Sequence, residues 1–112
     1  MKCTVARTGI IIAEQVELAQ SFCTRLKGLM FRKELQPKTG LLLEPCPQIH
    51  TCFMRFNIDV VFLDAQNRVL ATIENLKPWR MSRFYRQARR TLELPGGSIQ
   101  GEIQVGEELI FN

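Results

Sequence analysis

The strongest constraint on the fold is the run from Ile58 to Leu63, which is apolar at every position except Asp59. Its content of Val, Ile and Phe is typical of a β-strand that is buried on both faces. Just before this run, the segment HTCFM carries the only histidine of the chain, His50. In extended backbone the side chains of His50, Cys52 and Met54 would share one face, so we expect a candidate site here.

Short β-branched or alternating segments, separated by turn-forming residues, recur along the chain and predict further strands. These segments are residues 4–6, 9–13, 15–19, 41–43, 49–53, 60–63, 68–76, 91–94 and 108–111. After Ser21, a suitable N-cap, apolar residues from Phe22 to Met30 recur at helical spacing and predict one helix. We therefore expect a mostly β fold, an antiparallel β-sandwich or partly closed barrel of eight to nine short strands with one short α-helix at about residues 21–32.

The composition is that of an ordinary globular protein. With 112 residues, 46% hydrophobic and 23% charged, the chain is expected to form a single domain, residues 1–112, that buries roughly two-thirds of the unfolded surface. No apolar run reaches the ~18 residues of a membrane span, and the N-terminus lacks the apolar segment of a signal peptide. We therefore expect a cytoplasmic protein without membrane contact, whose four cysteines are reduced thiols in or near the core.

Six motifs occur in order along most of the chain. They are RLKGLMFR at 25–32, GLLL at 40–43, HTCFM at 50–54, IDVVFLD at 58–64, LKPWR at 76–80 and LELPGG at 92–97. In this order and spacing, the sequence resembles the domain-of-unknown-function family 192, also called uncharacterised protein family UPF 0127. The resemblance implies a compact, mostly β domain of sandwich type, found in bacteria and archaea, and no established activity. Because the family commonly has an aromatic residue at the position of Cys52, the resemblance implies no nucleophile or ligand role for that thiol.

Two acidic residues, Asp59 and Glu93, lie within apolar strands, where an unpaired carboxylate is costly. Each therefore needs a cationic or backbone partner. Arg25 and Arg32 are natural candidates, because residues seven positions apart lie on one face of a helix. The pairs either tie the helix to the sheet or converge on a cleft that binds a polar small molecule.

The first functional interpretation is a small-ligand-binding or accessory module with a cleft near His50, Asp59 and Glu93. The two acids would orient the arginine of the cleft, and His50 would form a hydrogen bond with the ligand. Apolar walls would come from Met and aromatic side chains, although such side chains are more often core. The candidate cleft residues are Arg25, Met30, Arg32, His50, Met54, Asp59, Trp79 and Glu93. The second interpretation is an enzyme that uses an Asp, Glu or His side chain as general acid or base.

Cys46, His50 and Cys52 form a C-x3-H-x-C arrangement that contains possible zinc ligands. No fourth ligand is close in sequence, and structural zinc motifs prefer paired C-x2-C spacings, so we expect no metal and no cofactor. Side chains on the same face of a strand lie about 7 Å apart at successive positions, which is long for direct proton transfer between His50 and Cys52.

A basic segment between residues 77 and 90 supports a third interpretation, nucleic-acid binding. Its cations alternate with aromatic rings, a composition that can bind phosphates and stack on bases. The candidates are Lys77, Arg80, Arg83, Tyr85 and Arg86. The net charge of +4 is small for a duplex binder and no recognised motif is present, so a solvated loop is the alternative. The partner is otherwise an unknown small molecule or protein.

Overall fold

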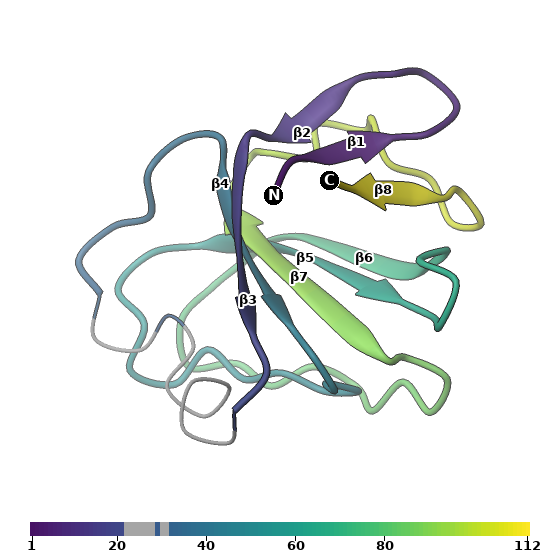
Figure 1. Cartoon of the computed structure of the whole chain (residues 1–112). Helices are drawn as coiled ribbons and strands as arrows, with labels where there is room; N and C mark the ends of the chain where they lie inside the picture. The colour runs from purple at the N-terminus through teal and green to yellow at the C-terminus, as the bar shows by residue number, and fades with distance from the viewer. Residues whose placement is uncertain (22–28, 30–31) are drawn as a thin grey trace.

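The computed structural model describes residues 1–21, 29 and 32–112, which form eight strands and no helix. The strands are β1 (Cys3–Val5), β2 (Ile11–Ala13), β3 (Gln15–Ala19), β4 (Thr39–Leu43), β5 (Ile58–Leu63), β6 (Val69–Leu76), β7 (Arg90–Pro95) and β8 (Leu109–Phe111) (Figure 1). Among these residues, no helix is long and apolar enough to cross a membrane.

The strands form two sheets, one with the order β2-β1-β8 and one with the order β3-β4-β7-β5-β6. All pairs are antiparallel except β3 and β4, which run parallel because the long connection between them returns to the same end of the sheet. The prediction of a mostly β fold is confirmed, and of the two expected alternatives, sandwich or partly closed barrel, the structure has two sheets. The sheets do not close into a barrel, and the arrangement is not wholly antiparallel.

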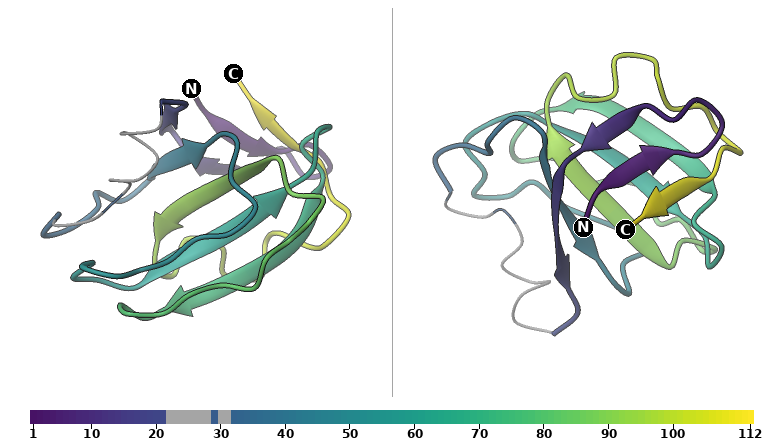
Figure 2. Two further views of the ribbon diagram at one scale, coloured as in Figure 1. Left: turned by 90° about the horizontal axis from the view of Figure 1, so that it is seen from below. Right: turned by 45° about the horizontal axis from the view of Figure 1, so that its top comes forward.

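The three-stranded sheet lies across one face of the five-stranded sheet (Figure 2). A continuous core fills the space between them. It joins Val5, Ile12 and Leu109 of the small sheet to Leu42, Val61, Leu92 and Leu94 of the large one. Each such side chain contributes about 1.5–3 kcal/mol through removal from water.

Loops rather than a sheet cover the opposite face of the five-stranded sheet. There, Leu29, Ile49, Met54 and Ala88 pack against a second apolar cluster formed by Leu41, Leu43, Ile58, Val60 and Phe62. Both faces of β5 are therefore covered, and all six of its residues are buried. This confirms the prediction of a strand buried on both faces.

Two predicted elements, at about residues 21–32 and at residues 49–53, are not among those of the described structure. Most of the helix expected at about residues 21–32 lies outside the described residues, and the described positions Ser21, Leu29 and Arg32 are not helical. The strand predicted for residues 49–53 is wrong. This segment forms only one isolated bridge, His50 to Met81, and then turns, because Phe53 has a positive φ of 64° and Met54 N donates to Thr51 O at 3.2 Å.

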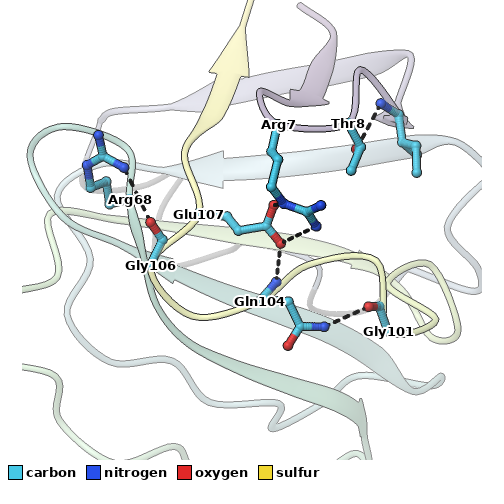
Figure 3. A network of polar contacts seen from close by, with 8 residues as sticks. Arg7, Thr8, Arg68, Gly101, Gln104, Gly106 and Glu107 are labelled. Carbon is cyan, nitrogen blue, oxygen red and sulfur yellow. Dashed lines mark hydrogen bonds and ion pairs between the residues drawn. The ribbon is translucent and has the colours of Figure 1, made fainter.

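A polar network holds the loop before β8 against the turn between β1 and β2 (Figure 3). Arg7 Nε donates to Glu107 Oε2 at 3.0 Å, and the other oxygen of Glu107 accepts from Gln104 N at 2.9 Å. Arg68 Nη1 donates to Gly106 O at 3.3 Å on the other side of the same loop. These contacts fix the edge of the small sheet through side chains and backbone carbonyls.

Candidate functional site

Asp59 is a fully buried carboxylate whose partners are backbone amides. Its Oδ1 accepts from Asn75 N at 2.9 Å and from Gly97 N at 3.1 Å, and its Oδ2 accepts from Ile99 N at 2.8 Å. Three such bonds satisfy the buried charge. Asp59 thus ties the end of β6 and the loop after β7 to β5, and the backbone alternative of the sequence analysis is the one that the structure shows.

Glu93 faces the other side of the same sheet. Its Cα partners across β4 and β5 are Leu41 and Val60, which belong to the loop-covered cluster, whereas Asp59 pairs with Leu94 of the cluster between the sheets. Because directly opposed residues point to the same face, the two acids point in opposite directions. They do not converge on one cleft.

Glu93 is only 3% exposed. Within the part of the chain that the structure describes, no hydrogen bond reaches its carboxyl group. Burial raises the pKa of Glu93 to about 8, against the opposing influence of the nearby positive charge of Arg32. At neutral pH the group is therefore mostly protonated, and it can donate as well as accept a hydrogen bond.

A groove of about 240 Å³ lies between β3, β4 and the segment 32–36, and Glu93 is not one of its lining residues. Arg32 lines this groove, and its Nη2 lies 4.0 Å from Glu17 Oε2 in an exposed ion pair. Leu41, which is directly opposite Glu93 in the sheet, lines it too. The remaining lining residues are Gln15, Val16, Glu17, Glu34, Leu35, Gln36, Thr39 and Gly40.

A second groove, of about 310 Å³, lies on the other side of the segment that precedes β4. Ile12, Lys38 and the glycines of the loop after β7, Gly96 and Gly97, line it. None of the candidate residues from the sequence belongs to its lining. Asp59 supports this groove only indirectly, by holding Gly97 N.

The candidates near residue 50 form a separate group. His50 is half-buried, and its Nδ1 accepts from Cys52 N at 3.2 Å, so Nε2 is the nitrogen that can reach a ligand. Met54 is buried in the loop-covered core rather than lining an open wall. In the described residues, no contact joins His50 to Glu93 or Arg32.

The sequence-based site is therefore divided. Arg32 lines one groove and its charge acts on Glu93, which does not line that groove. Asp59 supports a loop on the opposite face of the sheet. His50, Met54 and Trp79 belong to the loops that cover the same face of the large sheet as Glu93. Arg25 and Met30 lie outside the described residues. The groove residue Glu17 was missed, because it belongs to β3, a separate strand whose place beside Arg32 has no signal in the sequence. Leu35, three positions after Arg32, was missed as well.

The basic segment 77–90 runs beside residues 48–52. Thr51, fully buried, is its anchor: Thr51 Oγ1 donates to Lys77 O at 2.6 Å, and Thr51 O accepts from Trp79 N at 3.0 Å. Tyr85 is half-buried with its ring 4.3 Å from that of Phe62, so it packs in the core and does not stand free for a base. Phe84, which was not among the candidates, is instead 63% exposed.

Cysteine chemistry finds little support among the described positions. Cys3 and Cys52 are free thiols, and Cys23 lies outside the described residues. Burial raises the pKa of Cys3 to about 12, which leaves it an unreactive thiol. Where the structure describes the chain, no three His, Cys, Asp or Glu side chains gather closely enough to hold a metal ion.

Comparison with known proteins shows a match to the family DUF192, described as an uncharacterised ACR, over residues 3–111. A UPF0127 protein of Pyrococcus furiosus is 37% identical over 108 residues, which cover 93% of this chain and 92% of the relative. A UPF0127 protein of Pyrococcus horikoshii is 41% identical over 86 residues, or 74% of each chain.

Two solved structures share the fold. One, of a protein of unknown function from Novosphingobium aromaticivorans, has a TM-score of 0.85 at 24% identity and covers 99% of this chain and 84% of its own. The other, described as a putative transcription regulator from Sinorhizobium meliloti, has a TM-score of 0.79 at 23% identity and covers 97% of this chain and 89% of its own. The family match spans nearly the whole sequence, and the chain therefore belongs to the uncharacterised DUF192 family.

Proposed function

We propose that this protein is a binding module for a small anionic molecule, which occupies the groove between β3, β4 and residues 32–36. Arg32 would bind the anionic group of the ligand, and Glu93 would form a hydrogen bond with it. Of the cleft residues expected from the sequence, only Arg32 and Glu93 belong to this site. It needs no contribution from Asp59 or His50.

The observation that carries the proposal is the nearly buried carboxyl group of Glu93, whose raised pKa is opposed by the positive charge of Arg32, an arginine that lines a groove. Groups with a strongly raised pKa beside a cavity are candidates for functional sites. Asp59, in contrast, is satisfied by three backbone amides.

The chemistry of the groove defines the class of ligand. The guanidinium of Arg32 suits a carboxylate or phosphate, because its N–H groups match the geometry of these anions. Leu35 and Leu41 add apolar surface. A protonated Glu93 can donate to an oxygen of the same anion without charge repulsion, so a small carboxylate or phosphate ester with a short apolar part fits best.

The test is thermal unfolding of the purified protein with a panel of small carboxylates, amino acids and phosphate esters. A ligand at 100 times its dissociation constant adds about 2.7 kcal/mol, which raises the unfolding midpoint of a domain of this size by several degrees. We expect a member of the panel to produce such a shift. Arg32→Gln should abolish the shift, and Glu93→Gln should reduce it.

Lys33→Gln is the matched control, because Lys33 is the exposed neighbour of Arg32 and does not line the groove. It removes the same charge and should leave the shift intact. A shift that survives in Arg32→Gln, or that Lys33→Gln removes equally, would contradict the proposal.

The second candidate function is an enzyme in which Glu93 is the general acid. A carboxyl group whose pKa lies near 8 is protonated at neutral pH and can donate a proton to a bound substrate. The same panel provides the test: conversion of a stabilising compound by the wild-type protein, lost in Glu93→Gln while binding persists, would favour the enzyme over the binding module.

A further inference from the structure

The loops that cover the face of the five-stranded sheet opposite the small sheet carry a concentration of positive charge. Residues 45–58 and 75–92 contain seven of the fifteen Lys and Arg residues and none of the eleven Asp and Glu residues. From Lys77 to Arg89 a cation occurs at every third position, and each of these side chains is exposed. The rest of the chain therefore carries more acidic than basic residues, although the protein as a whole is positive.

Among the described residues, the five regularly spaced cations from Lys77 to Arg89 have no acidic partner. In the described part of the chain, the ion pairs join Arg7 to Glu107, Arg32 to Glu17 and Arg90 to Glu44. The cations at positions 77, 80, 83, 86 and 89 take part in none of them. A row of unpaired cations attracts a polyanion, because the release of its counterions adds favourable free energy.

Large apolar side chains alternate with these cations at the surface. Trp79 is 58% exposed, Met81 is 70% exposed, and Phe84 follows in the same loop. The ring of Phe53, 47% exposed, comes from the neighbouring loop and lies 4.8 Å from that of Trp79, at an interplanar angle of 60°. Exposed rings between cations provide flat apolar surfaces on which bases can stack.

The backbone holds the rings of Phe53 and Trp79 in place. Phe53 and Trp79 both have positive φ angles, 64° and 62°, which bulky residues rarely adopt. Hydrogen bonds impose this conformation: Thr51 O accepts from Trp79 N, and Thr51 Oγ1 accepts from Arg80 N at 2.8 Å. Ser82 Oγ accepts from Ile49 N at 3.0 Å and continues the connection between the two loops. In Figure 1 these loops run together on the side of the large sheet away from the small sheet.

We propose that residues 77–86, together with Phe53, form a binding surface for single-stranded nucleic acid. Lys77, Arg80, Arg83 and Arg86 would bind phosphates, and Trp79 and Phe84 would stack on unpaired bases. A single strand fits better than a duplex, because rings can stack only on bases that are not already paired and stacked. It also fits better than an acidic peptide, which would leave the exposed rings without flat partners.

Trp79 is the only tryptophan of the chain, so intrinsic fluorescence reports on this surface directly. Titration with oligouridylate and oligothymidylate 12-mers at low salt should quench this fluorescence. With four phosphate contacts, the slope of log K against log salt concentration should be about −3, since each contact on a single strand contributes about −0.7. Equal quenching by both oligomers would mean that the surface binds bases and phosphates without contacting the 2′-hydroxyl. Stronger quenching by oligouridylate would mean that it also contacts the 2′-hydroxyl.

The matched comparison uses two triple variants that remove the same charge. The first variant combines Arg80→Gln, Arg83→Gln and Arg86→Gln, and it should reduce the slope to about −1. The second combines Lys2→Gln, Lys33→Gln and Lys38→Gln at exposed cations outside the two loops. It should leave the slope near −3. With a fluorescein-labelled oligomer, Trp79→Ala should weaken binding by about 10- to 100-fold, and Trp79→Phe should restore most of the loss. Unchanged unfolding midpoints establish that the variants are folded.

Three results would overturn the proposal: no quenching at low salt, equal loss of affinity in both triple variants, or equal binding of polyglutamate. A blue shift of Trp79 fluorescence with vesicles that contain phosphatidylserine, without any response to the oligomers, would overturn it in favour of an anionic membrane surface.

Discussion

At the scale of single residues, two buried carboxyl groups on adjacent strands differ because their surroundings differ. Asp59 accepts three backbone hydrogen bonds on one face of the sheet, whereas Glu93 has no such bond among the described residues on the other face. Both could be recognised from the sequence as acids within apolar strands. The sequence could not show which of the two acids accepts backbone hydrogen bonds, because the donors to Asp59 lie 16 to 40 positions further along the chain.

Asp59→Asn should destabilise the protein by about 3 kcal/mol, because it replaces a charged acceptor of three bonds with an amide whose N–H groups face other donors. Urea unfolding measures the loss. Asp64→Asn is the comparison: Asp64 Oδ1 accepts two backbone bonds at an exposed turn, and its substitution should cost no more than about 1 kcal/mol. Equal losses in the free energy of unfolding would show that burial does not increase the contribution of the hydrogen bonds to Asp59.

Glu93 should make the stability fall as the pH rises. Its pKa of about 8 in the folded protein exceeds the ordinary value of 4.5, so between these values the native state binds more protons than the unfolded state. The contribution is fully present below about pH 4.5 and is lost as the pH passes 8, with a slope of roughly 1 kcal/mol per pH unit. Urea unfolding from pH 5 to 9 measures this slope.

Glu93→Gln should remove this pH dependence and should be more stable than the wild-type protein at pH 9. Glu74→Gln, at an exposed position of β6, is the control and should retain the slope. A slope that persists unchanged in Glu93→Gln would assign the pH dependence to another group.

At the scale of strands and loops, local patterns predicted most of the strands. The predicted strand 15–19 matches β3, and 68–76 differs from β6 by one residue, because alternation and turn residues are local signals. The segment 49–53 has strand-like composition, but Thr51 bonds to the backbone of residues 77–80 and Phe53 turns the chain. The parallel pairing of β3 with β4, which forms the groove, has no local signal at all.

Gly40, in β4, is a point where the large sheet tolerates no side chain. A Cβ atom there would lie 2.9 Å from Leu94 Cδ2 and 3.2 Å from Glu93 O. Gly40→Ala should therefore destabilise the protein by about 1–3 kcal/mol through overpacking, as measured by urea unfolding.

The double variant Gly40→Ala with Leu94→Val tests the cause. Removing the clashing methyl group should make the double variant less destabilised than the sum of the two single changes. Strict additivity would mean that the contact with Leu94 is not the source of the loss.

At the scale of the whole molecule, the sequence predicted the class of fold but not the position of the site. The strand pattern indicated a mostly β protein, either a sandwich or a partly closed barrel, and the structure shows two sheets. The residues that were expected to form one cleft lie apart, because the two faces of a sheet point away from each other. Asp59 and Glu93, for example, lie on adjacent strands but on opposite faces. The groove at Arg32 and the basic loops instead depend on contacts between distant segments.

The central claim is that a small anionic molecule binds at the groove of Arg32 and Glu93. The most direct measurement is an amide ¹⁵N–¹H NMR titration with the compound that most raises the unfolding midpoint. We expect the largest changes in chemical shift in residues 15–17, 32–41 and 93, and we expect Arg32→Gln to abolish them. Changes concentrated in residues 50–54 and 77–86, with the groove signals unmoved, would contradict the claim.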